Sequence, residues 1–410
     1  MTRRVVITGL GTISPVGHTV KETWENIVNG VSGVGPITQF DTTNFLVKNA
    51  CEVKNFDPAR YMDAKEARRR DRYQQLASAA SLEALKQSGL EITKENAHRV
   101  AVIVSSAVGG LRTIETAVRT LVESGPRRIS PFAIPMLMSN GASGLIAIDT
   151  GAKGPNFSVA SACASGADGI GAGWMLIRSG MADAAIAGAS EASIVDTGVG
   201  AFDRVGAMTH RDTGAPQPFD KERDGLVMGE GSAILILESL DHAKARGAEI
   251  LAELAGYAAT ADAFHITAPA EDGRSGAMAM QNALRLAELN PEDLDYINAH
   301  GTGTPLNDAA ETVAIKRAFG EQAYQIPVSS TKSMTGHMMG ATGALEAIFC
   351  VQAIHTNTLP PTINYHTPDP ACDLDYIPNT AREAKVDVTM SNAFGFGGHN
   401  AVLVIKRFSG

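Results

Sequence analysis

The chain alternates short apolar runs with longer segments of helical periodicity along its whole length. Runs of three to six residues, rich in Val, Ile and Ala, occupy positions 5–8, 100–104, 184–187, 232–237, 296–298, 327–330 and 401–405. Apolar residues recur at helical spacing over positions 64–87, 275–289 and 343–355. Continuous apolar runs between such helices are typical of strands that are buried on both faces of a sheet. The alternation therefore predicts an α/β protein in which helices cover the sheets.

Length and charge limit the number of cores and the kinds of partner. A chain of 410 residues exceeds what one hydrophobic core usually serves, so we expect two core units. The net charge of −9 gives no bulk affinity for nucleic acid. No apolar stretch approaches the roughly 18 residues that a membrane helix needs. We therefore expect a soluble protein with no nucleic-acid or membrane partner.

Four cysteines are scattered along the chain, at positions 51, 163, 350 and 372. They form neither a CxxC pair nor the dense pattern of a disulfide-rich domain. Scattered cysteines of this kind are typical of a reducing compartment, so we expect a cytoplasmic location.

Several familiar ligand-binding motifs are absent from the sequence. The segment GLGTIS at 9–14 lacks the third glycine of a dinucleotide fingerprint, and no acidic residue follows at the required distance. There is no GxxxxGK[ST] loop, no HExxH motif and no GxSxG turn. We therefore expect no metal ion and no tightly bound cofactor.

Cys163 lies in a run of small residues, SVASACASG at 158–166. A predicted strand at 157–160 precedes it, and a predicted helix follows at 167–178. The positive end of a helix dipole favours a thiolate over a thiol, so we expect a lowered pKa for this cysteine. Small neighbours let a substrate approach the sulfur and leave backbone N–H groups free for an oxyanion. A buried structural cysteine explains this segment equally well.

Two segments of the chain repeat one pattern. VASACASG at 159–166 and VSSTKSMTGH at 328–337 each follow an apolar run and precede a helical one. A duplicated fold would place both loops on one face, near a common cleft. Coincidence between two loops of small residues is at least as good an explanation of the pattern by itself.

Three further glycine-rich segments contain reactive side chains. His300 lies in NAHGTGTP, Lys332 and His337 lie together in STKSMTGHMMG, and the segment 391–400 holds two phenylalanines. A single histidine in a loop is more often structural than catalytic. Two histidines, a lysine and a cysteine, each where a predicted strand ends in small residues, favour one common site.

These segments together resemble a known family. SACASG, NAHGTGTPLND, KSMTGHMMGATGALE and NAFGFGGHN are similar in order and spacing to the β-ketoacyl synthase signatures, above all to those of the stand-alone bacterial synthases of type II. The resemblance extends over essentially all 410 residues. It implies a thiolase-like fold, with duplicated βαβαβαββ halves in a five-layered αβαβα arrangement, and a homodimer. The halves would span 1–250, with the cysteine, and 251–410, with the two histidines.

The resemblance also implies a reaction. An acyl group would move from an acidic acyl carrier protein, which brings its own phosphopantetheine arm, to Cys163. Condensation with a malonyl thioester would then release CO2 and give a 3-oxoacyl thioester on the carrier. His300 and His337 match two neutral imidazole donors that stabilise the enolate. The backbone N–H groups of Cys163 and Phe396 match the oxyanion hole.

Other positions match supporting roles by the same resemblance. Lys332 and Glu346 match an electrostatic support, although a structural ion pair explains them equally well. Phe394 and Phe396 match a gate between the two steps, and Asp308 matches an acid of structural role. The positions matched to substrate binding are Val108, Ala133, Ile134, Ala162, Thr267, Thr302, Thr304 and Gly395.

A basic segment stands out in this acidic chain. Residues 60–72 carry six basic and three acidic side chains, a pattern usually found on a solvated helix face. The resemblance implies docking of the acidic carrier by Lys65, Arg68, Arg69, Arg127 and Arg128. His399 departs from the family pattern, because many relatives have Thr or Ser there.

Three rival functions remain open at this point. A ketosynthase of a polyketide pathway shares all four signatures. A non-catalytic chain-length subunit shares the fold but lacks the active cysteine, so Cys163 argues against it. A cysteine hydrolase would leave the second histidine and Lys332 without a role.

Overall fold

A computed structural model describes residues 3–410. Five strands from the N-terminal part of the chain form one half of the main sheet, in the order β5-β4-β6-β7-β1. β4 lies parallel to β5 and β6, and β7 lies antiparallel to β6 and β1. The strands are β1 (Val5–Ile13), β4 (Val100–Ser105), β5 (Asn156–Phe157), β6 (Ala184–Glu191) and β7 (Gly231–Ser239).

Five strands from the C-terminal part of the chain repeat this arrangement in the order β10-β9-β13-β14-β8. β9 lies parallel to β10 and β13, and β14 lies antiparallel to β13 and β8. These strands are β8 (Ala252–Ala261), β9 (Tyr296–Asn298), β10 (Val328–Ser329), β13 (Val388–Gly395) and β14 (His399–Lys406). Equivalent strands occupy equivalent places and directions in each half, so the predicted duplication is confirmed.

The two half-sheets meet along their outer strands. β1 and β8 pair antiparallel through only two residue pairs, Val6 with Glu253 and Ile7 with Ala252. Ten strands therefore form one continuous sheet that is joined at its middle by a short contact. The two loops that repeat one sequence pattern follow the third strand of each half, β5 and β10.

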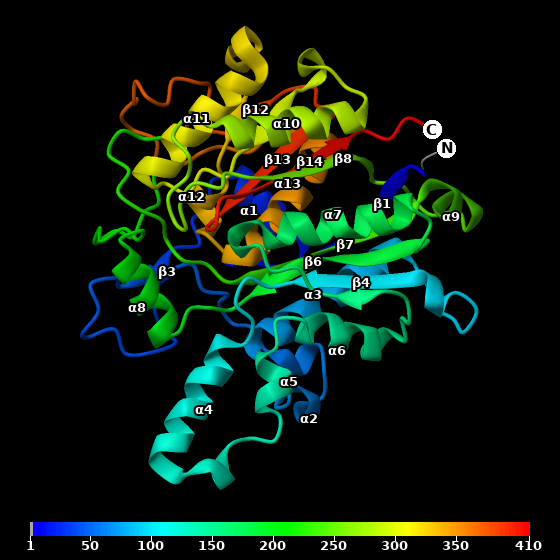
Figure 1. Ribbon diagram of the computed structural model, residues 1–410, viewed down its shortest axis with the longest axis vertical. Coiled ribbons are helices and arrows are strands. Elements are labelled where there is room, and N and C mark those ends of the chain that lie inside the picture. The colour runs from blue at the N-terminus through cyan, green and yellow to red at the C-terminus, as the bar shows by residue number, and fades with distance from the viewer. Residues whose placement is uncertain (1–2) are drawn as a thin grey trace.

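Helices cover these half-sheets in five layers, as predicted (Figure 1). From bottom to top in that view lie a helix layer, one half-sheet, a central helix layer, the other half-sheet and a second outer helix layer. The outer helices are α3 (Arg72–Ser88) and α6 (Gly141–Thr150) on one side, and α10 (Arg274–Ala287) and α11 (Pro305–Phe319) on the other. The central helices are α7 (Ser165–Arg178) and α13 (Thr342–Thr356).

The composition of the central helices explains their position. α13 is apolar on every side and nearly all its residues are buried, which is typical of a helix enclosed by a core. α7 carries many glycines and alanines, which let it pack closely against both half-sheets. Both helices begin at a candidate catalytic loop, so the core fixes the position of these loops.

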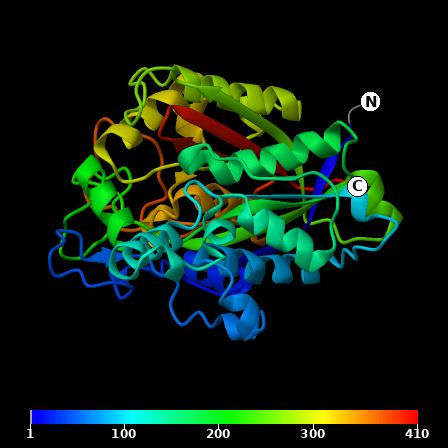
Figure 2. The same cartoon turned by 60° about the horizontal axis from the view of Figure 1, so that its bottom comes forward.

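Short elements complete the chain. α4 and α5 lie outside the layers in Figure 1, and Figure 2 brings this end of the molecule forward. The remaining helices are α1 (Val20–Val28), α2 (Ala64–Ala67), α4 (Leu111–Ser124), α5 (Ala133–Leu137), α8 (Asp196–Val205), α9 (Leu240–Ala245) and α12 (Lys332–Thr335). The remaining strands are β2 (Gly35–Pro36), β3 (Asn49–Ala50), β11 (Thr358–Leu359) and β12 (Arg382–Glu383). Among residues 3–410, no helix is long and apolar enough to span a membrane.

Two sequence-based boundaries were wrong. The predicted helix 64–87 is two helices, because Asp71 caps a new N-terminus and accepts a hydrogen bond from the Tyr73 N–H. The predicted strand 157–160 pairs only at Asn156–Phe157, after which the chain turns toward Cys163.

Candidate active site

Four loops meet at one cavity of about 320 Å³. Cys163 lies in a short 3-10 turn, η4 (Ala162–Ala164), directly before α7. His337 lies between α12 and α13, and His300 follows β9. The turn between β13 and β14 contributes Phe396. All four side chains line the cavity.

A contact between two backbones brings the cysteine and histidine loops together. A β-carbon built on Gly166 of α7 would lie 2.6 Å from the Gly340 carbonyl oxygen and 2.8 Å from the Ala344 nitrogen. A β-carbon on Gly343 would lie 3.1 Å from the Ala167 nitrogen. α7 and α13 therefore touch at a place where neither accommodates a side chain.

The turn between β13 and β14, residues 395–399, is called the gate turn here after the predicted role of Phe396. This turn also contacts the cysteine loop closely. A β-carbon on Gly395 would lie 2.9 Å from the Ser161 carbonyl oxygen and 3.0 Å from the Cys163 nitrogen. The ring of Phe396 stacks on Phe202 of α8, with centroids 6.2 Å apart. The backbone N–H groups of Phe396 and of Cys163 itself face the sulfur and lower its pKa. These two donors are those predicted for the oxyanion hole.

Burial decides the protonation of Cys163. It raises the pKa of the thiol to about 11, although the positive charge of Lys332 and the Phe396 N–H oppose the rise. The prediction of a lowered pKa is therefore wrong in sign. The helix terminus is where the sequence places it, but the enclosure of the sulfur by the core outweighs it.

The two histidines face each other inside the cavity. Their rings meet edge to face, with centroids 5.3 Å apart and an interplanar angle of 84°. The Phe394 ring lies 5.9 Å from that of His300. Burial and the nearby Lys332 cation hold the pKa of both histidines well below the usual 6.5. Both imidazoles are therefore neutral at neutral pH.

Hydrogen bonds position both histidines. The Thr342 hydroxyl lies 3.1 Å from Nδ1 of His337. Donation from this hydroxyl places the ring proton on Nε2, which is buried without a partner. Glu311 accepts the backbone N–H groups of His300 and Gly301 at 2.8 and 2.7 Å. One imidazole is thus fixed through its ring and the other through its backbone.

Lys332 and Glu346 form a buried ion pair beside the cavity, with Nζ and Oε1 2.7 Å apart. Burial raises the pKa of Glu346 to about 7, and the Lys332 cation opposes the rise. Neither side chain lines the cavity. Lys332 acts on the site through its field, because it lowers the pKa of Cys163 and of both histidines.

Known proteins resemble this chain over its whole length. The family model described as "Beta-ketoacyl synthase, N-terminal domain" matches residues 2–243, and the corresponding C-terminal domain matches residues 251–366. The chain belongs to the β-ketoacyl synthase family. A 3-oxoacyl-[acyl-carrier-protein] synthase 2 of Staphylococcus aureus (strain COL) is 50% identical over 408 residues, which cover 99% of each protein.

Solved structures of β-ketoacyl synthases share the fold. The ishigamide ketosynthase/chain length factor has a TM-score of 0.94 and 38% identity, with all of both chains covered. A type II polyketide ketosynthase bound to its hexaketide and in complex with its acyl-carrier protein has a TM-score of 0.92 and 36% identity, again with full coverage. These likenesses agree with the predicted thiolase-like fold.

Further residues matched to this family line the same cavity. Thr302, Thr304 and Thr267 lie on its wall. The hydroxyls of Thr302 and Thr304 lie 2.9 Å apart. Asp308 is fully buried behind them and accepts the N–H groups of Phe219 and Gly303 at 2.7 and 3.2 Å. Asp308 therefore fixes the conformation of the loop that carries Thr302 and Thr304.

Three predicted acyl-pocket residues lie elsewhere. Ala133 lines a separate cavity of about 1200 Å³, and Ile134 is 64% exposed on α5. Val108 is exposed at the end of the loop that follows β4. The chain by itself does not bring Ala133 and Ile134 to Cys163, because they belong to α5, which lies outside the five layers. The loop of Val108, by contrast, is joined to the Gly340 loop through Glu191.

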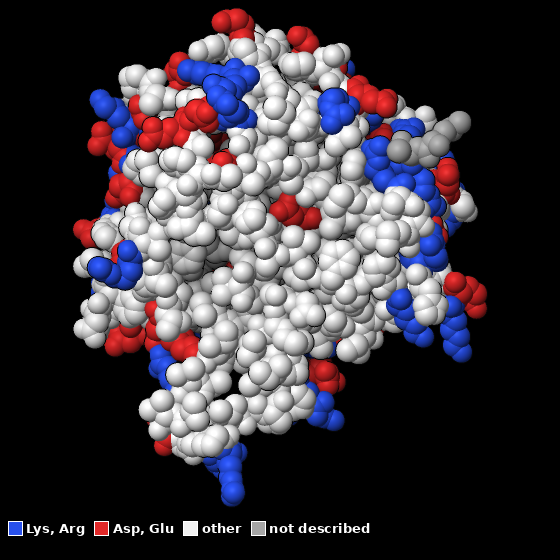
Figure 3. All heavy atoms as spheres, in the orientation of Figure 1, with Lys and Arg blue, Asp and Glu red and all other residues white. Residues whose placement is uncertain are grey.

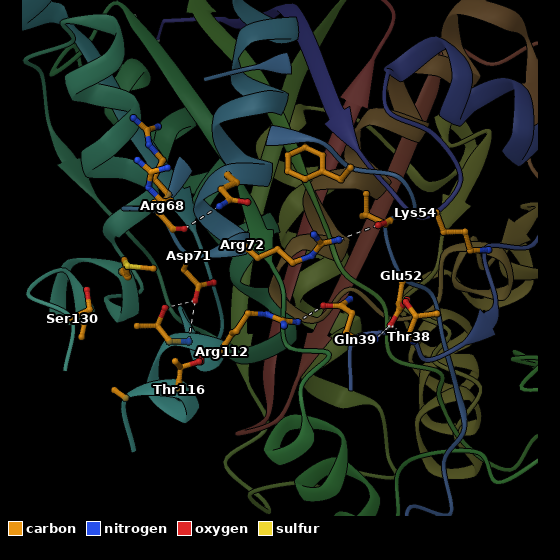
Figure 4. Close-up of a pocket in the computed structure, with 18 of the residues that line it drawn as sticks. Thr38, Gln39, Glu52, Lys54, Arg68, Asp71, Arg72, Arg112, Thr116 and Ser130 are labelled. Carbon is orange, nitrogen blue, oxygen red and sulfur yellow. Dashed lines mark hydrogen bonds between the residues drawn. The ribbon is translucent and has the colours of Figure 1, made fainter. Parts of the chain in front are cut away.

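The larger cavity brings two basic segments together. Arg68 and Arg128 both line it, although 60 residues separate them in the chain. Figure 4 shows Arg68 and Ser130 on the same side of this pocket. Lys65 and Arg127 are exposed, whereas Arg69 lies over the Phe132 ring. Two of the predicted docking residues, Arg68 and Arg128, therefore share one surface.

His399, where the sequence departs from many relatives, lines the Cys163 cavity at the start of β14. It pairs with Gly395 across the gate turn.

Sequence reasoning missed three polar residues around the site: Glu191, Glu311 and Thr342. Glu191 accepts the N–H groups of Ala107 and Gly340 at 2.8 and 3.2 Å and so joins two loops beneath Cys163. Glu311 lies one helical turn after Asp308, which is the only local signal for it. Contacts between distant segments define Glu191, whereas Thr342 lies only five residues after the histidine that it contacts.

Proposed function

We propose that this protein condenses an acyl group with a malonyl unit, both delivered by an acyl carrier protein, in type II fatty acid elongation. The observation that carries this proposal is a buried cysteine beside two neutral, inward-facing histidines. A cysteine hydrolase uses one histidine as base, and it would leave the second imidazole and Lys332 without a task. Identity of 50% to a 3-oxoacyl-[acyl-carrier-protein] synthase 2 supports the same reaction.

The first step transfers the acyl group. The sulfur of Cys163 gives up its proton and attacks the acyl thioester carbon. The carbon–sulfur bond to the carrier breaks as the new thioester forms, and the leaving carrier thiolate takes up a proton to become a thiol. Negative charge gathers on the carbonyl oxygen in between, and the N–H groups of Cys163 and Phe396 stabilise it. Because one thioester replaces another, the acyl group stays activated for the next step.

The second step forms the carbon–carbon bond. Malonyl thioester loses CO2, and the electron pair of the broken bond moves toward the thioester oxygen as an enolate. The N–H donors of His300 and His337 stabilise this oxygen. The enolate carbon then attacks the acyl carbon on Cys163, which expels the sulfur and leaves a 3-oxoacyl thioester on the carrier.

The lowered histidine pKa values suit donation rather than proton removal. Decarboxylation itself generates the carbanion, so the site needs no strong base. A protonated imidazole would place a second positive charge near Lys332, and that cation disfavours the imidazolium form at both rings. The carrier's phosphopantetheine arm is the only prosthetic group that this scheme requires.

A direct experiment tests the reaction. The protein is incubated with acylated carrier, and mass spectrometry follows one added acyl mass on Cys163. Addition of malonyl-carrier should release CO2 and yield the 3-oxoacyl product. Cys163→Ala should abolish both acylation and condensation. Acylation at one of the three other cysteines would refute the assignment.

The exposed basic side chains support docking of an acidic carrier. Lys65, Arg68, Arg127 and Arg128 are exposed, and opposite charge steers an encounter in a salt-dependent manner. Reversal of Lys65, Arg68 and Arg69 to Glu should raise KM for carrier-bound substrate. The reaction with a short pantetheine thioester should change little. Reversal of Lys86, Lys94 and Lys153, which are exposed elsewhere, is the matched control.

An apolar surface supports a homodimer. Figure 3 shows few charges over α4, α6 and α7, and this face includes the exposed edge strand β5. Its exposed apolar residues include Val118, Val122, Ile134, Ile148, Phe157 and Met175. Ile148→Lys should favour monomers in sedimentation, whereas Met278→Lys on α10 should not. A cytoplasmic location stays a prediction from the cysteines.

A polyketide ketosynthase remains the second candidate. One of the solved neighbours described above is the ketosynthase of a type II polyketide synthase, at 36% identity, and the other is a ketosynthase/chain length factor, at 38% identity. The fatty acid synthase relative is closer at 50%. Products that arise from one condensation for each round of reduction would support fatty acid synthesis. Unreduced polyketones built by repeated condensation would support the alternative.

A further inference from the structure

The residue before the nucleophile has an unfavourable backbone conformation. Ala162 has a φ of +50°, in the left-handed region where the β-carbon of an L-residue is crowded. Such a conformation persists only where surrounding contacts hold it. It aims Cys163 into the cavity, so whatever holds Ala162 also positions the sulfur.

Ser161, the residue that precedes Ala162, is held by a carboxylate on α7. The Ser161 hydroxyl donates to Oδ2 of Asp168 at 2.5 Å. Ser161 is also held locally, because its N–H donates to the Ser165 hydroxyl, which in turn donates to the Ala162 carbonyl oxygen. Asp168 lies in the first turn of α7, three residues after Ser165.

The second oxygen of Asp168 has a partner from the other half of the protein. The Tyr257 hydroxyl of β8 donates to Oδ1 at 2.8 Å. The Tyr257 ring lies directly against α7 at Gly171, where a β-carbon would come within 2.4 Å of ring atoms. Trp174 meets this ring edge to face, with centroids 6.4 Å apart. The tyrosine is thus wedged in place, and its hydroxyl fixes the carboxylate.

We propose that Asp168 is a positioning residue for Cys163. With Ser161 and Tyr257 it forms a three-residue clamp that keeps the left-handed turn at Ala162 and so aims the sulfur at the Phe396 N–H and the two histidines. The clamp touches no reacting atom. The proposal rests on the proposed function, since it concerns the residue that accepts the acyl group.

The clamp predicts a selective loss in the first chemical step. Ser161→Ala and Asp168→Ala should each slow acylation of Cys163 by acylated carrier about tenfold, with a smaller effect on KM. Asp168→Asn keeps one acceptor oxygen and should lose less. Malonyl decarboxylation, which depends on the histidines, should stay within about twofold. Equal losses in both steps, together with a lower Tm, would mean a structural role and would overturn the proposal.

A rescue experiment distinguishes positioning from general damage. Glycine adopts a positive φ without a β-carbon penalty, so the turn would depend less on the clamp in its presence. Ala162→Gly in the Ser161→Ala background should therefore recover at least half of the lost acylation rate. No recovery, or a further loss, would show that the clamp does not act by holding Ala162.

Two further variants complete the test. Tyr257→Phe removes only the remote hydroxyl and should slow acylation about two- to threefold; an unchanged rate would remove Tyr257 from the clamp. Ser179→Ala deletes a serine hydroxyl that donates to a carbonyl at the far end of α7, and it should leave acylation unchanged. If the wild-type protein is not acylated at Cys163, the proposed function fails. If it is acylated and the clamp variants match it, only this inference fails.

Discussion

The imidazole rings of His300 and His337 lie edge to face, with centroids 5.3 Å apart, in a site that keeps both neutral. Removal of either ring should slow malonyl decarboxylation by about 10²–10³-fold, the usual loss for one oxyanion donor. Acyl transfer to Cys163 should survive in part. Release of CO2 and mass spectrometry measure the two steps separately. A variant that decarboxylates at the wild-type rate would show that its histidine is not a donor.

Thr342 should control the tautomer of His337. Thr342→Ala removes the hydroxyl that lies 3.1 Å from Nδ1. If this hydroxyl donates to Nδ1, the ring proton no longer favours the inward nitrogen in the variant. We expect decarboxylation to fall about fivefold with little change in KM, in keeping with one lost hydrogen bond of about 1 kcal/mol. Thr342→Ser keeps the hydroxyl and should retain most activity. Equal loss in both variants would point to packing instead.

The reactivity of Cys163 should rise steeply with pH. Because burial raises its pKa to about 11, the thiolate fraction should increase about tenfold per unit between pH 7 and 10. Alkylation by iodoacetamide should follow this slope without a plateau below about pH 10. Lys332→Met should slow it further, since the Lys332 cation lowers that pKa. A plateau near pH 8 would instead support the lowered pKa of Cys163 that the helix terminus predicts.

Glu238 should make stability depend on acidity. Hydrogen bonds from Arg246, His242 and Thr8 outweigh its burial and lower its pKa from 4.5 to about 2. A carboxylate with a depressed pKa stabilises the fold above its unfolded pKa, and this contribution is lost as pH falls from about 4.5 toward 2. The shift corresponds to about 3 kcal/mol.

Denaturant unfolding measures this contribution. Glu238→Gln should lower the free energy of unfolding at pH 7 by an amount of that order, and it should flatten its acid dependence. Glu249→Gln, on an exposed side chain, is the control and should change neither. An unchanged acid profile for Glu238→Gln would assign the dependence to other groups, such as Asp183, whose pKa Arg99 and Arg3 also lower to about 2.

A methyl group on Gly395 should impair acylation of Cys163. The added β-carbon would lie about 3 Å from two backbone atoms of the cysteine loop, closer than carbon atoms approach in folded proteins. We expect Gly395→Ala to slow acylation more than tenfold while far-ultraviolet circular dichroism stays unchanged. Gly144→Ala, where a β-carbon also meets no atom within 4 Å, is the matched control. Normal acylation in Gly395→Ala would mean that the gate turn moves aside at no cost.

Local patterns identified the duplicated fold and the loops of the site. The loops at 159–166 and 328–337 reveal the repeat because each must join a strand to a central helix through small residues. The break at Asp71 escaped notice because apolar periodicity continues across it, whereas a capping side chain ends one helix and starts another.

Properties that depend on distant contacts could not be predicted. The sign of the Cys163 pKa shift follows from enclosure by α13 and the gate turn, which no nearby residue encodes. Glu191 joins loops 84 and 149 positions away in the chain. The acyl-pocket positions Ala133 and Ile134 illustrate the same limit, because the path of the segment around α5 is not visible in its sequence.

The glycine contact between α7 and α13 fixes the distance between the two catalytic loops. Each helix carries one reagent at its leading end, sulfur on one and imidazole on the other, and bare backbone separates them. Rotamer changes can tilt either reagent but cannot alter the spacing of the two axes. A single methyl group at Gly166 would increase that distance. A site that accepts acyl groups of different sizes must therefore gain its room elsewhere than in this core.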